Sequence, residues 1–317
     1  MVKTLDIDFM GRPGVIASGL IEGPDGLALV DPGPASSLDG LRAALGAVGH
    51  ALEEVEAILV THIHLDHSGG VGVMVRSNPR LQVYVHERGA PHIVDPSKLV
   101  SSASRLYGEN MDRMWGEVVP VAAENVHPLK GGEVLRVAGT DVRVAYTPGH
   151  ASHHVSYFDT SSGTAWVGDT GGIRIGAPLL VVPPTPPPDI DLDAWDASLD
   201  LIRAWNPQRV FLTHFGGFEQ PLEHLADLQE RLHQAASDVR SLLADQSLDN
   251  EQRQARFVDR MVRTFRERLP DEDWVQRYQL AVPLDHCWHG LARYWSKKGP
   301  KGPVSGSAGS RSVRGAP

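Results

Sequence analysis

Residues 61–70 contain a dense group of histidines and one aspartate, in the order Thr-His-Ile-His-Leu-Asp-His-Ser-Gly-Gly. On an extended chain, residues two apart project to the same side, so His62 and His64 can hold one metal ion. Asp66 and His67 lie at the turn before a predicted helix and can serve a second ion. Neutral imidazole and carboxylate suit zinc, and also iron or manganese. This spacing therefore predicts a metal-binding site.

Three more candidate ligands, His150, Asp169 and His214, share one kind of position, because each is predicted to stand where a strand ends. The three predicted strands cover residues 141–146, 164–168 and 209–213. Loops that leave rigid strands can bring polar groups together at one point, so we expect these side chains to converge. A carboxylate has two oxygens, and Asp169 can therefore bridge two ions.

The elements that must position these residues alternate between strand and helix, which indicates α/β layers. Predicted strands cover 14–21, 27–30, 57–61 and 81–85, with helices at 37–48 and 68–76. After an irregular helical excursion at 87–118, strands at 133–137, 141–146, 155–158 and 164–167 form a second sheet. Six prolines between 178 and 188 favour an extended surface loop. We expect Leu179 to Val182 to form a hydrophobic rim beside Asp169, and Asp193 to cap a helix at 194–204.

The chain is expected to divide into three parts. Residues 1–220 form the catalytic domain, and residues 221–296 form an extension of amphipathic helices that serves as a dimer interface or a lid. Residues 297–317 are rich in glycine, serine and proline and carry basic side chains, which predicts a disordered tail.

Charge and composition exclude several classes of function. The 317 residues include 30 lysines and arginines against 39 aspartates and glutamates, for a net charge of −9, so we expect no nucleic-acid partner and no basic membrane surface. A single cysteine, Cys287, allows no intrachain disulfide. With no secretory pattern and no apolar run long enough to span a membrane, a cytoplasmic protein is expected.

Together the motifs resemble those of the metallo-β-lactamase superfamily: residues 61–70, Thr-Pro-Gly-His at 147–150, Gly-Asp at 168–169 and Thr-His at 213–214. The resemblance implies an αββα sandwich, in which two mixed β-sheets lie face to face with helices outside. It also implies two divalent metal ions, zinc above all, with iron or manganese as alternatives. By position, His62, His64 and His150 would hold one ion, while Asp66, His67 and His214 would hold the other, with Asp169 bridging. Asp31 matches a position that supports the site.

The resemblance further implies a hydrolase. We expect a hydroxide held by both ions to attack an ester-type bond of a small molecule, whether carboxyl ester, lactone or thioester, with Asp66 orienting or shuttling the proton. A phosphoesterase on the same site is one alternative. A mononuclear iron persulfide dioxygenase is another. A non-catalytic role for the metal site, as a structural clip, is disfavoured because these ligands leave room for water and substrate.

Departures from known relatives narrow the choice of substrate. The bridging aspartate argues against a true β-lactamase. Lactonases tend to carry a tyrosine at the position that is Gly172 here, so lactonase activity is open but has no support from this position. Relatives of the glyoxalase II type bind glutathione through basic and tyrosine side chains. Arg277, Tyr278, Arg293 and Tyr294 are candidates for that role here, although they do not align with the known pattern.

Other residues receive a structural interpretation. His153 and His154 are either supporting hydrogen-bond donors or polar residues at a strand start, and neither is taken as a ligand. The run His-Cys-Trp-His at 286–289 is expected to be a packed helix start rather than a metal site. Met111, Met114 and Trp115 are expected in the core, with a pocket wall as the alternative.

Overall fold

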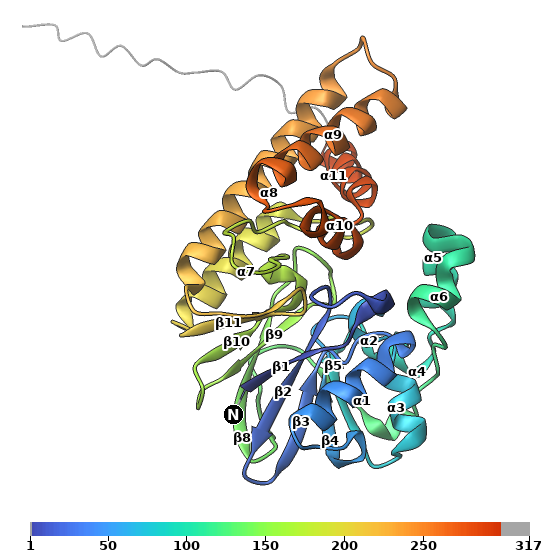
Figure 1. Ribbon diagram of the computed structural model, residues 1–317, viewed down its shortest axis with the longest axis vertical. Helices are drawn as coiled ribbons and strands as arrows, with labels where there is room; N and C mark the ends of the chain where they lie inside the picture. The colour runs from blue at the N-terminus through green and yellow to red at the C-terminus, as the bar shows by residue number, and fades with distance from the viewer. Residues whose placement is uncertain (1, 299–317) are drawn as a thin grey trace, which may run out of the picture.

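The computed structural model describes residues 2–298, which fold into two six-stranded sheets that pack face to face (Figure 1). The first sheet has the strand order β1-β2-β3-β4-β5-β6. Its strands are β1 (Val2–Asp6), β2 (Ala17–Gly23), β3 (Gly26–Val30), β4 (Val55–Leu59), β5 (Gln82–His86) and β6 (Val126–Leu129). The pairs from β1 to β3 are antiparallel and those from β3 to β6 are parallel, so the sheet is mixed.

The second sheet has the order β12-β11-β10-β9-β8-β7. Its strands are β7 (Val134–Val137), β8 (Thr140–Tyr146), β9 (Val155–Asp159), β10 (Thr164–Trp166), β11 (Arg209–Leu212) and β12 (Gly216–Phe218). Only β10 and β11 pair in parallel, which makes this sheet mixed as well. The sequence patterns did not indicate β1, β6 or β12, which are short strands with few apolar residues.

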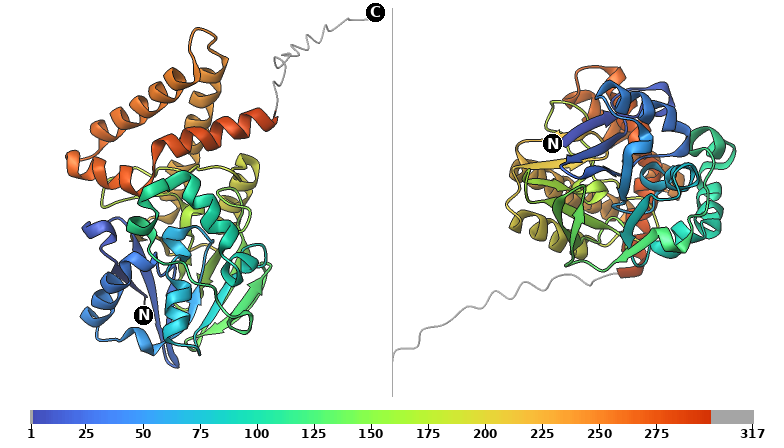
Figure 2. Two further views of the ribbon diagram at one scale, coloured as in Figure 1. Left: turned by 90° about the vertical axis from the view of Figure 1, so that its right-hand side faces the viewer. Right: turned by 90° about the horizontal axis from the view of Figure 1, so that it is seen from below.

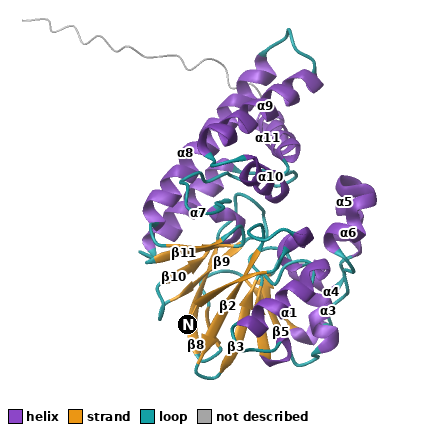
Figure 3. Ribbon diagram, viewed as in Figure 1, coloured by secondary structure: helices purple, strands orange, loops and turns teal. Residues whose placement is uncertain are grey.

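Helices cover the outer faces of both sheets, so the predicted αββα sandwich is confirmed (Figure 3). On the side of the first sheet they are α1 (Leu38–Ala47), α2 (Leu65–Ser68), α3 (Val71–Ser77), α4 (Ala90–Val94), α5 (Ser97–Tyr107) and α6 (Met111–Trp115). On the side of the second sheet are α7 (Leu192–Ala204) and the beginning of α8 (Pro221–Ala244), while α9 (Asn250–Arg268), α10 (Glu272–Ala281) and α11 (Leu284–Lys298) follow at one end of the sandwich.

Apolar side chains fill the three spaces between these layers. Val30 and Leu59 of the first sheet meet Trp166 and Phe211 of the second in a cluster between the sheets. A second cluster lies under the helices of the first sheet. The third runs without a break from the second sheet through α7 into α8–α11, so the C-terminal helices share a core with the sandwich. The left view of Figure 2 shows these helices stacked on one end of the sandwich.

Three local predictions need correction. The helix expected at 68–76 is present as α3, but it begins only at Val71, because Gly69 and Gly70 separate it from the short helix α2. The cap of α7 is Asp191, whose carboxylate accepts from the backbone of residues 193 and 194, and not Asp193. Of the expected hydrophobic rim, Leu179 is exposed, but residues 180–182 are core, because Val182 pairs with Ile173 in an antiparallel bridge and the three side chains are buried beneath α8.

The end of α11 also differs from the prediction. The helix includes Lys297 and Lys298, which the sequence assigned to the tail, since Lys298 pairs with Asp193 and Lys297 donates to the carbonyl of Pro188. The rest of the predicted tail, 299–317, lies outside the described residues. Within residues 2–298, no helix has both the length and the apolar composition needed to cross a membrane.

Candidate metal centre

Seven side chains that are far apart in the sequence meet at one edge of the sandwich, in two groups. Within each group the candidate ligand atoms all lie within 4.8 Å of one another. The first group is His62, His64, His150 and Asp169, and the second is Asp66, His67 and His214. These are the seven residues that the sequence motifs single out.

The strands deliver these residues to a common edge. His62 and His64 follow β4, and the short helix α2 begins immediately after them and carries Asp66 and His67. His150 follows β8, Asp169 lies in a 3₁₀ turn (Gly168–Gly171) after β10, and His214 follows β11. Because β10 and β11 run parallel, their carboxyl ends place Asp169 and His214 side by side.

Three imidazole nitrogens face one another in the first group. His64 Nδ1 lies 3.0 Å from His62 Nε2 and 3.0 Å from His150 Nε2, and the last two atoms are 3.2 Å apart. Their partners on the other side of each ring decide which nitrogen carries the proton. His150 Nδ1 must donate to the carbonyl of Pro184, at 2.8 Å, so its Nε2 presents a lone pair.

His62 is held in the same tautomer. Its Nδ1 lies 3.1 Å from the Thr61 hydroxyl, which itself donates to Asp31 and is therefore free to accept from the imidazole. The lone pairs of His62 and His150 thus point at each other across 3.2 Å. Two facing lone pairs repel each other unless a cation lies between them, so this arrangement is suited to a metal ion.

In the second group, Asp66 Oδ2 lies 3.3 Å from His214 Nε2 and 3.8 Å from His67 Nε2. Asp169 faces both groups with different oxygens. Its Oδ2 is 3.5 Å from His150 Nε2, and its Oδ1 is 3.2 Å from His67 Nε2. The geometry is that of a carboxylate placed to bridge two ions.

Asp31 lies behind both groups and forms hydrogen bonds that orient their histidines. Its Oδ2 accepts from His67 Nδ1 at 2.7 Å and from the hydroxyls of Thr61 and Thr213 at 2.7 and 2.8 Å. The two threonines precede His62 and His214, the histidines that follow β4 and β11, so one buried carboxylate orients ligands that follow strands of both sheets. His214 Nδ1 lies 2.9 Å from the carbonyl of Val15, which directs Nε2 inward.

The buried polar atoms provide a test of whether a metal fits. His67 Nε2, Asp169 Oδ1 and His214 Nε2 are buried and make no hydrogen bond within residues 2–298. Most buried polar atoms in proteins have a hydrogen-bond partner, so three such atoms in one cluster need another explanation. All three are metal ligands by type, and the residues therefore fit a divalent ion in each group.

Charge favours the same conclusion. Burial lowers the pKa of His62 well below its usual value and that of His64 to about 4, so both rings are neutral, the form that binds metal. Burial would lower the pKa of His67 too, but the carboxylates of Asp169 and Asp66 outweigh it and raise that pKa well above normal. Those carboxylates would stabilise a metal cation in the same way as they stabilise a proton.

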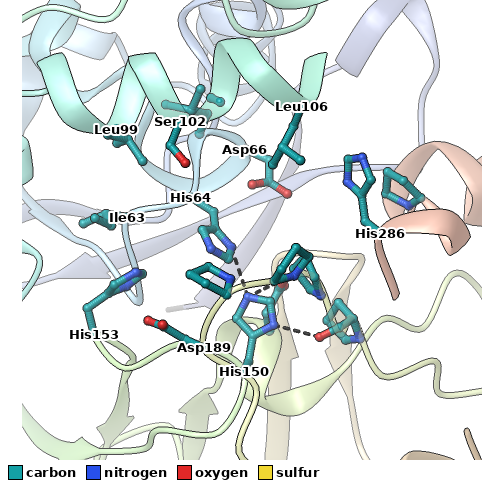
Figure 4. A pocket seen from close by; sticks show the side chains of 18 of the residues that line it. Ile63, His64, Asp66, Leu99, Ser102, Leu106, His150, His153, Asp189 and His286 are labelled. Carbon is teal, nitrogen blue, oxygen red and sulfur yellow. Dashed lines mark hydrogen bonds and ion pairs between the residues drawn. The ribbon is translucent and has the colours of Figure 1, made fainter. Parts of the chain in front are cut away.

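A cavity of about 360 Å³ opens onto this cluster (Figure 4). Its apolar wall is formed by the exposed face of α5, with Leu99 and Leu106, and by Trp115 of α6. The proline-rich loop at 184–188 and the start of α11 complete it. The sequence did not show that these segments share one cavity, because they are far apart in the chain and carry no common motif.

The residues that received a structural interpretation from the sequence lie around the ligand groups and in the cavity wall. His154 is buried and lies 3.0 Å from the Thr147 hydroxyl, whereas His153 lines the cavity. Trp115 is both core and cavity wall. The run at 286–289 is a packed helix start, as predicted, and belongs to no metal-binding group in the described chain. Burial raises the pKa of Cys287 to about 11.

The residues considered for glutathione binding lie elsewhere. None of the four lines the cavity. Arg277 forms an ion pair with Asp273, and the hydroxyl of Tyr278 is buried, donating to Leu180 O and accepting from Ile175 N. The role proposed for them from the sequence therefore has no support in the structure.

Comparison with known proteins identifies the class to which this fold and site belong. The family model described as metallo-beta-lactamase superfamily matches residues 11–214, and the chain is a member of that superfamily. A metallo-beta-lactamase fold-containing protein of Sulfurisphaera tokodaii is 28% identical over 183 residues, which cover 56% of this chain and 67% of that one. A hydroxyacylglutathione hydrolase of a Synechococcus strain is 31% identical over 153 residues, or 48% of this chain and 47% of the relative. This match therefore spans less than half of the hydrolase.

Among solved structures, a metallo-beta-lactamase family protein of Thermus thermophilus superposes with a TM-score of 0.67 at 21% identity. The superposition covers 94% of this chain and 93% of that chain, so the likeness in fold extends through the sandwich into the C-terminal helices. A subclass B3 metallo-beta-lactamase from a soil metagenome covers 74% of this chain with a TM-score of 0.53. At such identities the likeness is one of fold alone.

Proposed function

We propose that the protein is a metal-dependent hydrolase that cleaves an ester-type bond, such as a carboxyl ester, lactone or thioester, in a small molecule. The observation that carries this proposal is the double cluster of ligand atoms, with Asp169 facing both groups through different oxygens. The superfamily to which the chain belongs is consistent with it, as is the similarity to a hydroxyacylglutathione hydrolase.

In this proposal His62, His64 and His150 would hold one ion, Asp66, His67 and His214 would hold the other, and Asp169 would be available to both. Zinc is the ion that the ligand set favours, with iron and manganese as alternatives. When bound, two such ions supply Lewis acidity, which lowers the pKa of a shared water and polarises the scissile carbonyl.

The side chains of the protein have separate tasks around the reacting bond. Asp66 lines the cavity and is 22% exposed, against 6% for Asp169, so its carboxylate is the one accessible to an attacking water. Burial would raise the pKa of Asp66, but the neighbouring rings of His67 and His214 outweigh it and lower that pKa to about 2. Asp66 is therefore ionised and can orient the water and relay its proton towards the leaving group. Trp115, Leu99 and Leu106 exclude bulk water from the apolar side of the cavity.

The test is metal analysis combined with a panel of substrates. Protein stripped with a chelator and reloaded with zinc, manganese or iron is assayed for bound metal and for turnover of chromogenic carboxyl esters, thioesters and phosphoesters. Two zinc ions per chain with ester or thioester turnover support the proposal. Turnover of phosphoesters alone would assign a phosphoesterase instead, and one iron with oxygen uptake on a persulfide would assign a dioxygenase.

Two variants connect turnover to the site. His64→Ala and Asp169→Ala remove one ligand from the first group and the bridging ligand, and each should abolish turnover while the far-UV circular dichroism stays that of the folded protein. A double variant with full activity would contradict the proposal. A location in the cytoplasm and a homodimer formed through the C-terminal helices remain further proposals, which cell fractionation and sedimentation would test.

A further inference from the structure

His153 is an imidazole beside the two candidate ligand groups, and within residues 2–298 its ring has no polar partner. Its ring stacks on that of His62 at 6.1 Å between centroids and meets His64 edge-on at 5.7 Å. Neither of its nitrogens makes a hydrogen bond within residues 2–298, and Nδ1 is fully buried. By contrast, the rings of His62, His67, His150 and His214 are each fixed by a partner on the side away from the cluster.

The surroundings of His153 determine where its proton lies. The buried Nδ1 faces no acceptor, so a neutral ring keeps its proton on Nε2, where the cavity gives the N–H access to a partner. The ring is only partly buried and is one of the side chains that line the cavity. His153 therefore presents a hydrogen-bond donor to whatever the cavity holds.

Arg88 continues this donor surface towards the cavity mouth. Its Nη1 donates to the Tyr146 hydroxyl at 3.0 Å and to the carbonyl of Ser152, the residue before His153, at 3.4 Å. Its guanidinium also lies 5.6 Å from the centre of the Tyr146 ring, so the side chain is held in place. Nε and Nη2 make no hydrogen bond in the described part of the chain, and Arg88 is exposed.

Outside the two candidate ligand groups, the charged side chains that line the cavity are mixed in sign but net positive. Arg88 and Lys98 are cations, while Asp189 is the one carboxylate among these lining residues. One oxygen of Asp189 already accepts from the backbone and the hydroxyl of Ser152. A neutral donor beside a fixed guanidinium, in a cavity that a lysine also lines, is an arrangement that recognises an anion.

We propose that His153 and Arg88 bind a carboxylate on the substrate, so that the natural substrates are carboxylate-bearing esters or thioesters. This inference rests on the proposed hydrolase function and names its substrate class. The carboxylate would accept from His153 Nε2 on the side of the cluster and from Arg88 on the side of the mouth, which would orient the scissile bond towards the ligand groups.

A second histidine in the cavity provides a control for the role of His153. His286 of α11 also lines it, but lies on the far side of His64 and His150 from His153 (Figure 4). Its ring packs against that of Tyr107. If any imidazole in the cavity could supply the donor, removing His286 would have the same effect as removing His153.

The experiment compares two esters that differ only in charge, mono-4-nitrophenyl glutarate and 4-nitrophenyl valerate, in which a methyl replaces the carboxylate. With zinc-loaded protein we expect kcat/KM to be at least about tenfold higher for the glutarate ester. His153→Leu and Arg88→Gln should each remove most of that preference, mainly through KM, and leave turnover of the valerate ester within about twofold. His153→Gln, which keeps an N–H donor, should restore part of it, and His286→Leu should leave the preference unchanged.

A binding measurement separates this inference from the hydrolase proposal. Calorimetric titration with glutarate itself should show binding to the wild-type protein and at least about tenfold weaker binding to the His153 and Arg88 variants. The metal content of each variant must match the wild type, since a loss would make His153 a ligand and overturn the inference. Equal turnover of both esters by the wild-type protein would also overturn the inference. So would a preference for the glutarate ester that survives in both His153→Leu and Arg88→Gln, or one that disappears in His286→Leu alone. Failure to hydrolyse any ester, with glutarate binding intact, would instead reject the hydrolase.

Discussion

His67 Nδ1 lies 2.7 Å from Asp31 Oδ2, deep in the protein, where neither side chain is exposed to solvent. The same oxygen accepts from Thr61 and Thr213, so the contact connects the metal cluster to the ends of a strand in each sheet. Orientation of the ligands and cohesion of the two sheets therefore depend on one carboxylate.

Replacing that carboxylate should affect both properties. Asp31 has a positive φ of 49°, a conformation that asparagine also tolerates, so Asp31→Asn changes charge and hydrogen bonding without backbone strain. We expect a loss of about 3 kcal/mol in the free energy of unfolding and about 10- to 100-fold weaker metal binding. Denaturant unfolding and competition with a chelating dye measure the two effects. An Asn variant with wild-type metal affinity would show that Asp31 plays no part in orienting His67.

The second group can be tested by metal stoichiometry. His214→Ala removes a ligand from that group only, because His214 Nε2 approaches Asp66 at 3.3 Å and lies 3.8 Å from the bridging Asp169. Metal content should fall from about two ions to about one per chain, as measured by mass spectrometry of the purified protein. His233→Ala, which removes an exposed histidine paired with Asp196, is the matched control and should retain the full content. Unchanged content in His214→Ala would remove His214 from the ligand set.

Gly168 holds the turn that presents Asp169. Its φ is 44°, and a Cβ atom there would lie 2.5 Å from Thr61 Oγ1 and 2.8 Å from His154 Nε2. Gly168→Ala should destabilise the protein by about 2 to 4 kcal/mol and weaken metal binding, because both the backbone and the support of the ligands must shift. Gly46→Ala, in α1 with open space around it, should instead stabilise by up to about 1 kcal/mol. Thermal unfolding of the pair provides the comparison, and equal melting temperatures would contradict it.

His224 predicts a dependence of stability on pH that is separate from the metal ligands. Burial lowers its pKa to about 4, and its Nε2 lies 2.7 Å from the carbonyl of Gly171. Because the unfolded chain takes up a proton near pH 6.5 and the folded chain only near pH 4, this contribution is complete above pH 6.5 and is lost as the pH falls towards 4. From pH 7 to pH 5 the loss is about 2 kcal/mol.

The variant His224→Gln isolates this effect. It should be less stable than the wild type at pH 7, and the difference between the two should shrink by about 2 kcal/mol at pH 5, because glutamine does not titrate in this range. Urea unfolding of both proteins at the two pH values gives the measurement. A difference that stays constant between pH 7 and pH 5 would show that His224 does not titrate abnormally.

Much of the metal centre could be recognised from the sequence because its information is local. The spacing of His62 and His64, and the turn that carries Asp66 and His67, depend on backbone geometry within a few residues. The strand that precedes His150, Asp169 or His214 is likewise a local pattern of apolar residues. The alternation of such strands with helices also indicated the layered fold.

Tertiary packing decided two local features that the sequence pattern left open: the environment of residues 179–182 and the residue that caps α7. Leu179 to Val182 were predicted to form a surface rim because apolar residues on a loop beside Asp169 have little core to join. In the structure Ile173 pairs with Val182, and α8 covers residues 180–182. Asp193 and Asp191 are equally good caps by type, and only the direction of the chain entering α7 selected Asp191.

The sequence alone determined which seven side chains could bind metal and which layered fold would carry them, since both follow from residue type and short-range spacing. The tertiary structure alone decided that Asp31 connects the two sheets, and that His153 and Arg88 line one cavity with α5 and α11. These relationships join residues separated by many positions. They depend on how strands and helices pack in space, which no local pattern encodes.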